Sequence, residues 1–135
     1  MLREETNLEN LRILTEMNIG LRAAEQMDNQ MSESEVETRM KDFISGTQYR
    51  VFSIWQSSDA IGYAVIDVTR KPLYLRQLFI SEEYRRFGNG TNALADLCKL
   101  FATDHFDVEV MSWNTEAIKF YEKIGFKKRV VGLRS

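Results

Sequence analysis

The sequence predicts an α/β (α+β) fold: a mixed, mostly antiparallel sheet with helices on both of its faces. Three observations predict it. Two amphipathic helical patterns occupy residues 8–46, and three consecutive strand-like segments joined by short turns fill residues 48–80. Helical and strand-like segments then alternate over the rest of the chain. Three adjacent strands with short turns favour an antiparallel meander, and the later alternation makes the sheet a mixed one.

The composition is typical of a globular protein with one domain, residues 1–135. The 135 residues are 44% hydrophobic and 28% charged, and their formal net charge is -2. This weak charge is not that of a nucleic-acid-binding surface. No apolar run approaches the ~18 residues of a membrane span. Cys98 is the single cysteine and the first ten residues do not resemble a signal peptide, so we expect a cytoplasmic protein.

Two capping boxes introduce the helical patterns. In Thr6-Asn7-Leu8-Glu9 a hydroxyl residue is followed three positions later by a Glu, and Ser32-Glu33-Ser34-Glu35 repeats this arrangement. Gly46 predicts the end of the second helix. Apolar residues recur at helical spacing behind each box, as Leu8, Leu11, Leu14, Met17 and Leu21, and as Val36, Met40, Phe43 and Ile44.

Strand-like segments follow at residues 48–56, 61–69 and 73–80, which are rich in aromatic and β-branched residues. Residues 90–103 return to helical spacing and residues 106–113 alternate as a strand. Asn114 is expected to cap a short helix that ends in a left-handed turn at Gly125. The last predicted elements are that helix, over residues 114–124, and a strand over residues 128–133.

The junction between the third strand and the next helix is the first segment that carries chemistry. Backbone N–H groups at a helix N-terminus point at a bound group, and the helix dipole favours an anion. Gly88 and Gly90 allow close approach and positive φ, while Arg85 and Arg86 add charge for phosphate oxygens. The junction predicts a pyrophosphate cradle, and a plain turn that contains glycines is the alternative. The spacing excludes the nucleotide-triphosphatase loop and the dinucleotide fingerprint.

Two motifs in this half of the chain resemble those of one family. Arg85-x-x-Gly88-x-Gly90 resembles the acyl-coenzyme A signature of the GNAT family of N-acetyltransferases, which is Arg/Gln-x-x-Gly-x-Gly/Ala. Asn114-x-x-Ala117-x-x-Phe120-Tyr121-x-x-x-Gly125-Phe126 resembles that family's second signature. The resemblance at motif level covers residues 75–126. It extends loosely over the whole chain, in which residues 2–5 look like a shortened first strand.

The resemblance implies acetyl-coenzyme A as the acetyl donor and specific residues that bind it. Backbone N–H groups of the cradle would hold the pyrophosphate, and the backbone of the third strand would pair with the pantetheine arm. The Asn114 side-chain amide would contact the same arm. The donor-binding residues implied in this way are Leu78, Ile80, Arg85, Arg86, Phe87, Gly88, Asn89, Gly90, Thr91 and Asn114.

The resemblance also implies a catalytic acid. Tyr121 would lie near the sulfur and protonate the leaving thiolate. A phenol with a pKa of ~10 is a fair acid for a thiolate whose conjugate acid has a pKa of ~8.5. The alternative is an aromatic core residue on the helix face that Tyr121 shares with Ala117 and Ile124.

The base is implied less directly. Glu109, five residues before Asn114, falls where the branch of the family that acetylates protein N-termini places its base. The alternatives are a carboxylate that faces solvent or pairs with a Lys, and a base supplied by a chain of waters. Tyr74 stands where histone-modifying members keep a Glu, which argues against a base of that type.

The predicted reaction is direct transfer of the acetyl group to a primary amine, with the oxyanion held by backbone N–H groups. The chain shows no metal-ligand set. The acceptor, a small molecule or a peptide or protein amine, is left open, because the family builds that pocket from variable parts, here residues 7–46 and the last strand. Arg76 and Gln77 are polar residues on a largely buried strand and are expected either to contact the acceptor or to be satisfied structurally.

Other interpretations remain at this point. A non-catalytic acyl-coenzyme A-binding or interaction module on the same fold would keep the cradle without needing Tyr121. A helical interaction protein would use the first two helices and leave both motifs as coincidence. The oligomeric state, including a homodimer, and the length of the transferred acyl group are open as well.

Overall fold

A computed structural model describes residues 1–135 and contains one five-stranded sheet. The strands lie in the order β1 (Leu2–Glu5), β2 (Tyr49–Gln56), β3 (Asp59–Asp67), β4 (Leu73–Ile80) and β5 (Phe106–Val108). The first four are antiparallel neighbours, while β5 pairs with β4 in parallel. The predicted meander and the mixed, mostly antiparallel sheet are therefore confirmed.

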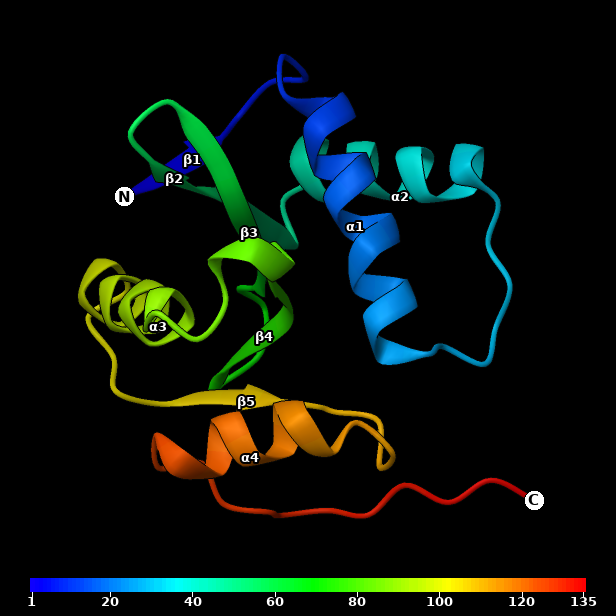
Figure 1. Cartoon of the computed structure of the whole chain (residues 1–135), viewed down its shortest axis with the longest axis vertical. Coiled ribbons are helices and arrows are strands. Elements are labelled where there is room, and N and C mark those ends of the chain that lie inside the picture. The colour runs from blue at the N-terminus through cyan, green and yellow to red at the C-terminus, as the bar shows by residue number, and fades with distance from the viewer.

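Helices cover both faces of the sheet, as predicted (Figure 1). They are α1 (Leu11–Glu25), α2 (Glu33–Ser45), α3 (Asn89–Leu100) and α4 (Thr115–Lys123), and a single 3₁₀ turn, η1 (Glu82–Tyr84), follows β4. The first two helices pack on one face of the sheet and the last two on the other. No helix combines the length and the apolar character needed to cross a membrane.

The sheet feeds a separate core on each face because neighbouring strand residues point to opposite sides. Val51 joins the core under α1 and α2, whereas Phe52 joins the core under α3 and α4. Central strand β3 is buried over its last seven residues and contributes to both cores. The strand that leads to the functional residues, β4, is therefore held firmly along its β3 side.

Several predicted helix ends are confirmed by their hydrogen bonds. The Glu35 N–H donates to Ser32 Oγ at 3.1 Å and the Ser32 N–H donates to Glu35 Oε1 at 2.9 Å, which completes a capping box. The Ala117 N–H donates to Asn114 Oδ1 at 3.2 Å, so Asn114 caps α4. Gly125 has a φ of 108°, as the left-handed stop requires.

The capping box predicted at Thr6 is wrong. Helix α1 begins at Leu11, and the cap position is Asn10. The Glu9 N–H donates to Asn7 Oδ1 at 3.0 Å, and Asn10 Nδ2 donates to Glu5 Oε1 at 3.0 Å. These bonds form a turn that carries the chain from β1 into the helix. The local pattern matched a cap, but the pairing of β1 with β2 places the chain in a turn at this point.

Two strand predictions also need correction. The strand predicted over residues 106–113 ends at Val108, because β5 has a partner only along the first part of β4. Residues 128–133 form no strand, and their large apolar side chains are exposed, at 77% for Val130, 85% for Val131 and 92% for Leu133. An alternation of apolar and polar residues forms a strand only where a neighbouring strand is available to pair with it.

Candidate active site

The middle of β4 carries a β-bulge at Arg76, which has no partner opposite it on β3. Strand β5 pairs with β4 only at residues 73–75. The edge of β4 beyond the bulge therefore has no strand partner on its β5 side. An unpaired edge offers backbone N–H and C=O groups to an extended ligand. Leu78 and Ile80, the residues predicted to pair with the pantetheine arm, lie on this edge.

The cradle, residues 86–91, lies where the chain enters α3. None of its six backbone N–H groups donates to an acceptor within the protein. Arg86 has a φ of 68° and Gly88, the N-cap of α3, has a φ of 81°. Left-handed residues in such a turn direct successive N–H groups toward one side, and the helix dipole adds positive potential there. The backbone thus has the free donors that an anion site requires.

The side chains of this loop are used differently from one another. Arg85 Nε donates to the Ile80 carbonyl oxygen at 2.7 Å, so this guanidinium fastens the loop to the end of β4. Asn89 Nδ2 donates to the Tyr84 carbonyl oxygen at 2.9 Å and closes the loop from the other side. Arg86 and Phe87 are exposed. The cradle is held in shape by Arg85 and Asn89, and Arg86 is the charge free to face a ligand.

Gly90 has a role that the sequence did not predict. It lies in the first turn of α3 without the positive φ expected for it. A Cβ atom built there would lie 3.1 Å from Phe120 Cζ and 3.9 Å from Ile80 Cγ1. The missing side chain lets α3 approach α4 and the end of β4. This contact brings Tyr121, whose ring centre lies 5.0 Å from that of Phe120, toward the cradle.

Tyr121 combines a packed ring with a free hydroxyl. Its ring packs against Phe120 and Phe126, and only 9% of the residue is exposed. The hydroxyl makes no hydrogen bond to another protein group. Burial raises the pKa of Tyr121, and the Glu25 carboxylate and the Tyr74 hydroxyl raise it further. At neutral pH this phenol therefore keeps its proton, and its hydroxyl can donate a hydrogen bond or a proton.

Glu25, the last residue of α1, is the carboxylate that acts on Tyr121. Burial raises the pKa of Glu25, although three guanidinium groups nearby act in the opposite direction. We call these groups the arginine cluster: Arg22, Arg39 and Arg76. Sequence reasoning missed Glu25 because it belongs to no motif. Its one signal was a position at the end of the first amphipathic helix.

Glu109, the base implied by the resemblance, lies one residue beyond β5 and is exposed. Its carboxylate acts on Tyr74: burial is the main cause that raises the pKa of this tyrosine, and Glu109 raises it further. Glu109 does not act on Tyr121 in the same way. Tyr74 is thus a neighbour of both Glu109 and Tyr121, while Glu25 is the carboxylate whose charge acts on Tyr121 itself.

A hydrogen bond joins the loop before α4 to the end of α1. Trp113 Nε1 donates to the backbone carbonyl oxygen of Glu25 at 2.8 Å. The next residue, Asn114, uses its Oδ1 atom to cap α4. The amide Nδ2 of Asn114 is left available for the predicted contact with the pantetheine arm. The two residues together hold α4, and with it Tyr121, against the side of the molecule that carries Glu25.

A buried polar network connects the arginine cluster to the sheet. Asn18, which is fully buried, donates through Nδ2 to the Tyr63 hydroxyl at 2.6 Å and to Gln77 Oε1 at 2.7 Å. The Tyr63 hydroxyl also donates to Gln77 Oε1 at 2.8 Å. Arg39 Nη2 donates to Asn18 Oδ1 at 3.0 Å. Gln77 is therefore satisfied structurally, whereas Arg76 beside it is exposed.

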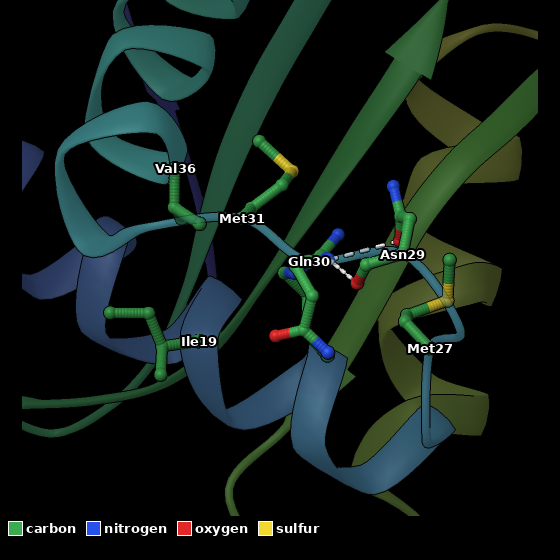
Figure 2. A pocket seen from close by; sticks show the side chains of 7 residues that line it. Ile19, Met27, Asn29, Gln30, Met31 and Val36 are labelled. Carbon is green, nitrogen blue, oxygen red and sulfur yellow. Dashed lines mark hydrogen bonds between the residues drawn. The ribbon is translucent and has the colours of Figure 1, made fainter.

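A pocket of about 200 Å³ lies between α1 and the segment that leads into α2 (Figure 2). Ile19 and Val36 approach it from the two helices, and Met27 and Met31 from the connecting segment. Arg22 Nη2 donates to the Asn29 carbonyl oxygen at 2.9 Å and to Asn29 Oδ1 at 3.0 Å. These bonds hold the segment after α1 in place beside the arginine cluster.

Known structures share this arrangement of strands and helices. BH1408 from Bacillus halodurans, as a tetramutant, aligns with a TM-score of 0.78 at 19% identity over 100% of this chain and 99% of that chain. The aminoglycoside N-acetyltransferase AAC(6')-Iy, in complex with CoA, aligns with a TM-score of 0.78 at 15% identity over 100% and 93%. A putative acetyltransferase from Pyrococcus furiosus aligns with a TM-score of 0.73 at 17% identity over 100% and 97%.

A search of curated protein sequences finds no match. Residues 18–126, well over half of the chain, match the family model described as acetyltransferase (GNAT) family. That range includes β4, the cradle, Glu25 and Tyr121, so the family match and the geometry concern the same part of the molecule. The chain belongs to the GNAT family of acetyltransferases.

Proposed function

We propose that this protein transfers an acetyl group from acetyl-coenzyme A directly to a primary amine. One observation carries the proposal: six backbone N–H groups without protein acceptors, at residues 86–91, adjoin an unpaired strand edge and a helix that carries a buried tyrosine with a free hydroxyl. This combination suits a ligand with an anionic end and an extended arm. Coenzyme A has both, and it is bound by the similar protein AAC(6')-Iy.

The chain's own residues supply binding, orientation and proton transfer. The cradle binds the pyrophosphate, and the free edge of β4 at Leu78 and Ile80 aligns the pantetheine arm, with Asn114 Nδ2 as a further donor. Acetyl-coenzyme A supplies an activated acyl group as its thioester. In the net reaction the C–N bond to the acceptor forms and the C–S bond of the thioester breaks. The amine loses one proton and the sulfur gains one. Tyr121 is the proposed proton donor to that sulfur.

An amine is protonated at neutral pH and must lose a proton before it attacks. Two carboxylates lie near Tyr121 and its neighbour Tyr74, those of Glu25 and Glu109. We assign the base to Glu25, because it is half-buried and acts on the same tyrosine that we propose as the acid. A raised carboxyl pKa also makes it a better proton acceptor than an ordinary carboxylate. Glu109 is the alternative base.

The proposed donor site is tested by adding one negative charge to it. Thr91 is exposed and is the third residue of α3, where an Asp stabilises a helix through the dipole. Thr91→Asp should therefore keep the melting temperature while it lowers coenzyme A affinity about 10-fold or more, measured by calorimetry. Ala95→Asp, one turn further along the same helix and also exposed, is the matched control and should bind normally.

The activity is tested by incubating the protein with acetyl-coenzyme A and a panel of amines, with thiol release and product mass as the two readouts. We expect acetylated product with at least one class of amine. A different result would identify a non-catalytic binding module: the parent binds coenzyme A, Thr91→Asp abolishes that binding, and no amine is acetylated. Equal affinity of Thr91→Asp and Ala95→Asp for coenzyme A would contradict the cradle.

A further inference from the structure

Three arginines lie near the proposed catalytic groups, and none of them forms a salt bridge with a carboxylate. The side chains of the arginine cluster come from α1, α2 and the bulge of β4. None of them lies within 4.0 Å of a carboxylate oxygen in a salt bridge, while other arginines of the chain, such as Arg50 and Arg134, do. All three guanidiniums act on one nearby carboxylate, that of Glu25. The cluster therefore has more positive charge than its neighbours balance.

Arg39 is the member whose charge is least satisfied. Its Nη2 atom donates to Asn18 Oδ1, but its Nε atom is buried and has no hydrogen-bond partner. Burial lowers the pKa of Arg39, and the charges of Arg76 and Arg22 lower it further. Arg39 shares the single counter-charge of Glu25 with Arg22 and Arg76, so the cost of taking its guanidinium out of water is only partly offset, and an anion bound beside it would offset more. Arg39 thus calls for an anionic partner.

Arg76 gives that partner a point of access. It is exposed, and the bulge that it forms is the place where β4 loses β5 as a neighbour. Arg22 donates two hydrogen bonds to Asn29, whereas Arg39 donates one to Asn18, so Arg39 and Arg76 keep more N–H donors for a ligand than Arg22 does. Guanidinium groups bind carboxylate and phosphate oxygens in a matching planar geometry.

We infer that the amine acceptor carries an anionic group, a carboxylate or a phosphate, which Arg39 and Arg76 bind while the amine faces Glu25 and Tyr121. This inference rests on the proposed function and adds the chemical class of its acceptor. The acceptor is a small molecule with charges of opposite sign at its two ends. Its ammonium end matches the carboxylate of Glu25, and its anionic end matches the arginine cluster.

This acceptor differs from the aminoglycosides on which AAC(6')-Iy acts. Aminoglycosides carry several ammonium groups at neutral pH, and AAC(6')-Iy has been seen with a bisubstrate analogue of one of them. The arginine cluster would repel a polycation, since like charges brought together in a partly desolvated site are costly. A shared fold does not fix the acceptor, because the pocket is built from side chains that the fold leaves free.

The test compares amines in pairs that differ in the anionic group, with kcat/KM calculated for the unprotonated amine in each case, because removing the anion also changes the amine pKa. An α-amino acid is compared with its carboxamide, and ethanolamine phosphate with ethanolamine, with neamine as the polycation. We expect kcat/KM to be roughly 10-fold to 100-fold higher for the anionic member of a pair, the range for a charge-assisted contact. The better of the two anionic compounds identifies carboxylate or phosphate as the group bound.

Arg76→Gln should reduce that ratio toward 1. The ratio is taken between two amines within one variant, so any change in the strength of the base Glu25, which affects both amines alike, cancels from it. Because Arg76 is exposed, the variant should fold. Arg12→Gln removes the same charge from an arginine whose side chain is 92% exposed, near the start of α1, and should leave the ratio as it is. An unchanged ratio in Arg76→Gln, or neutral amines or neamine acetylated as well as the anionic compounds, would overturn the inference and leave the proposed function standing.

Binding gives a second readout that does not depend on turnover. The same amine pairs are titrated into the protein saturated with coenzyme A, and the affinity is measured by calorimetry. Tighter binding of the anionic member, lost in Arg76→Gln, supports the inference even if no amine is acetylated, an outcome that would count against the proposed function alone. Equal binding of both members of each pair would overturn the inference.

Discussion

Around the cradle the groups that face a ligand are backbone N–H groups, whereas around Glu25 they are side chains from three different elements. The cradle depends on the conformation of one short segment, with Gly88 in the left-handed region and Arg85 bonded to the end of β4. The region of Glu25 depends on α1, α2 and β4 arriving at the same place. The first arrangement is local in sequence and the second is not.

In the proposed function, the cradle binds a donor that many proteins share and the region of Glu25 binds an acceptor particular to this protein, and the two kinds of construction suit these tasks. Almost any sequence that adopts the required turn conformation presents the same backbone N–H donors, so such donors suit a ligand that many proteins share. Side chains from separate elements can change one at a time without altering the turn. Tyr121 lies between the two regions, and it is the first place to probe the difference.

Tyr121→Phe should have the largest effect on activity. The ring and its packing stay, and the hydroxyl is lost. We expect turnover to fall roughly 10²-fold or more, the range for a positioned acid, with coenzyme A affinity unchanged. Because the hydroxyl bonds to no protein group, the melting temperature should not fall. Normal turnover in this variant would remove Tyr121 from the chemistry and leave it a core residue.

Glu25→Gln should have the next largest effect, and Glu109→Gln is its counterpart. If Glu25 is the base, turnover should fall about 10-fold at pH 7, and the loss should shrink at higher pH, where more of the amine is already neutral. Glu109→Gln should then behave like the parent. The reverse result in the two pH–rate profiles would assign the base to Glu109.

Glu25→Gln, which should lower activity, should raise the stability of the protein at neutral pH. A carboxyl whose pKa is raised by folding stabilises the protein while it is protonated, below about pH 4, and this contribution is lost as pH rises through the raised pKa. Glu25→Gln removes a half-buried charge that is unfavourable at pH 7. We expect this variant to melt at a higher temperature than the parent at pH 7, with the difference shrinking toward pH 4. A lower melting temperature at pH 7 would show that the arginine cluster stabilises this carboxylate more than burial opposes it.

Arg86→Ala should have the smallest effect. The exposed guanidinium is screened by water and salt, so the backbone donors are expected to carry most of the affinity for coenzyme A. We expect the dissociation constant to rise about 3-fold at physiological salt, and less at higher salt. A loss above about 30-fold by calorimetry would mean that the donor site, like the region of Glu25, depends on side chains.

The contrast between local and non-local features also decides what could be predicted from sequence. The meander, the Ser32 capping box, the Asn114 cap and the left-handed Gly125 were all predictable, because each depends on residues close together in the chain. The family followed from two local motifs in the same way. Each of these features can be predicted without knowing which distant residues lie beside it in the folded protein.

The remaining features depend on partners far away in the chain. Residues 128–133 have the composition of a strand but find no partner, and the strand of residues 106–113 ends where the bulge at Arg76 directs β4 away. The approach of Glu25 to Tyr121 and to Arg39 could not be predicted, since neither Glu25 nor Arg39 belongs to a motif. The positive φ expected at Gly90 was wrong, because this residue is helical and its missing side chain serves a packing contact with Phe120 of another helix.

The hydrogen bond from Trp113 to the Glu25 carbonyl also gives the protein a spectroscopic reporter. The chain has two tryptophans. Trp55 lies on β2, with the Arg3 guanidinium 4.5 Å from the ring centre and its Nε1 bonded to Ser53 Oγ. Trp113 is 47% exposed and bonded to the residue that we propose as the base. In a Trp55→Phe background, the fluorescence of Trp113 would therefore follow acceptor binding in real time without any label.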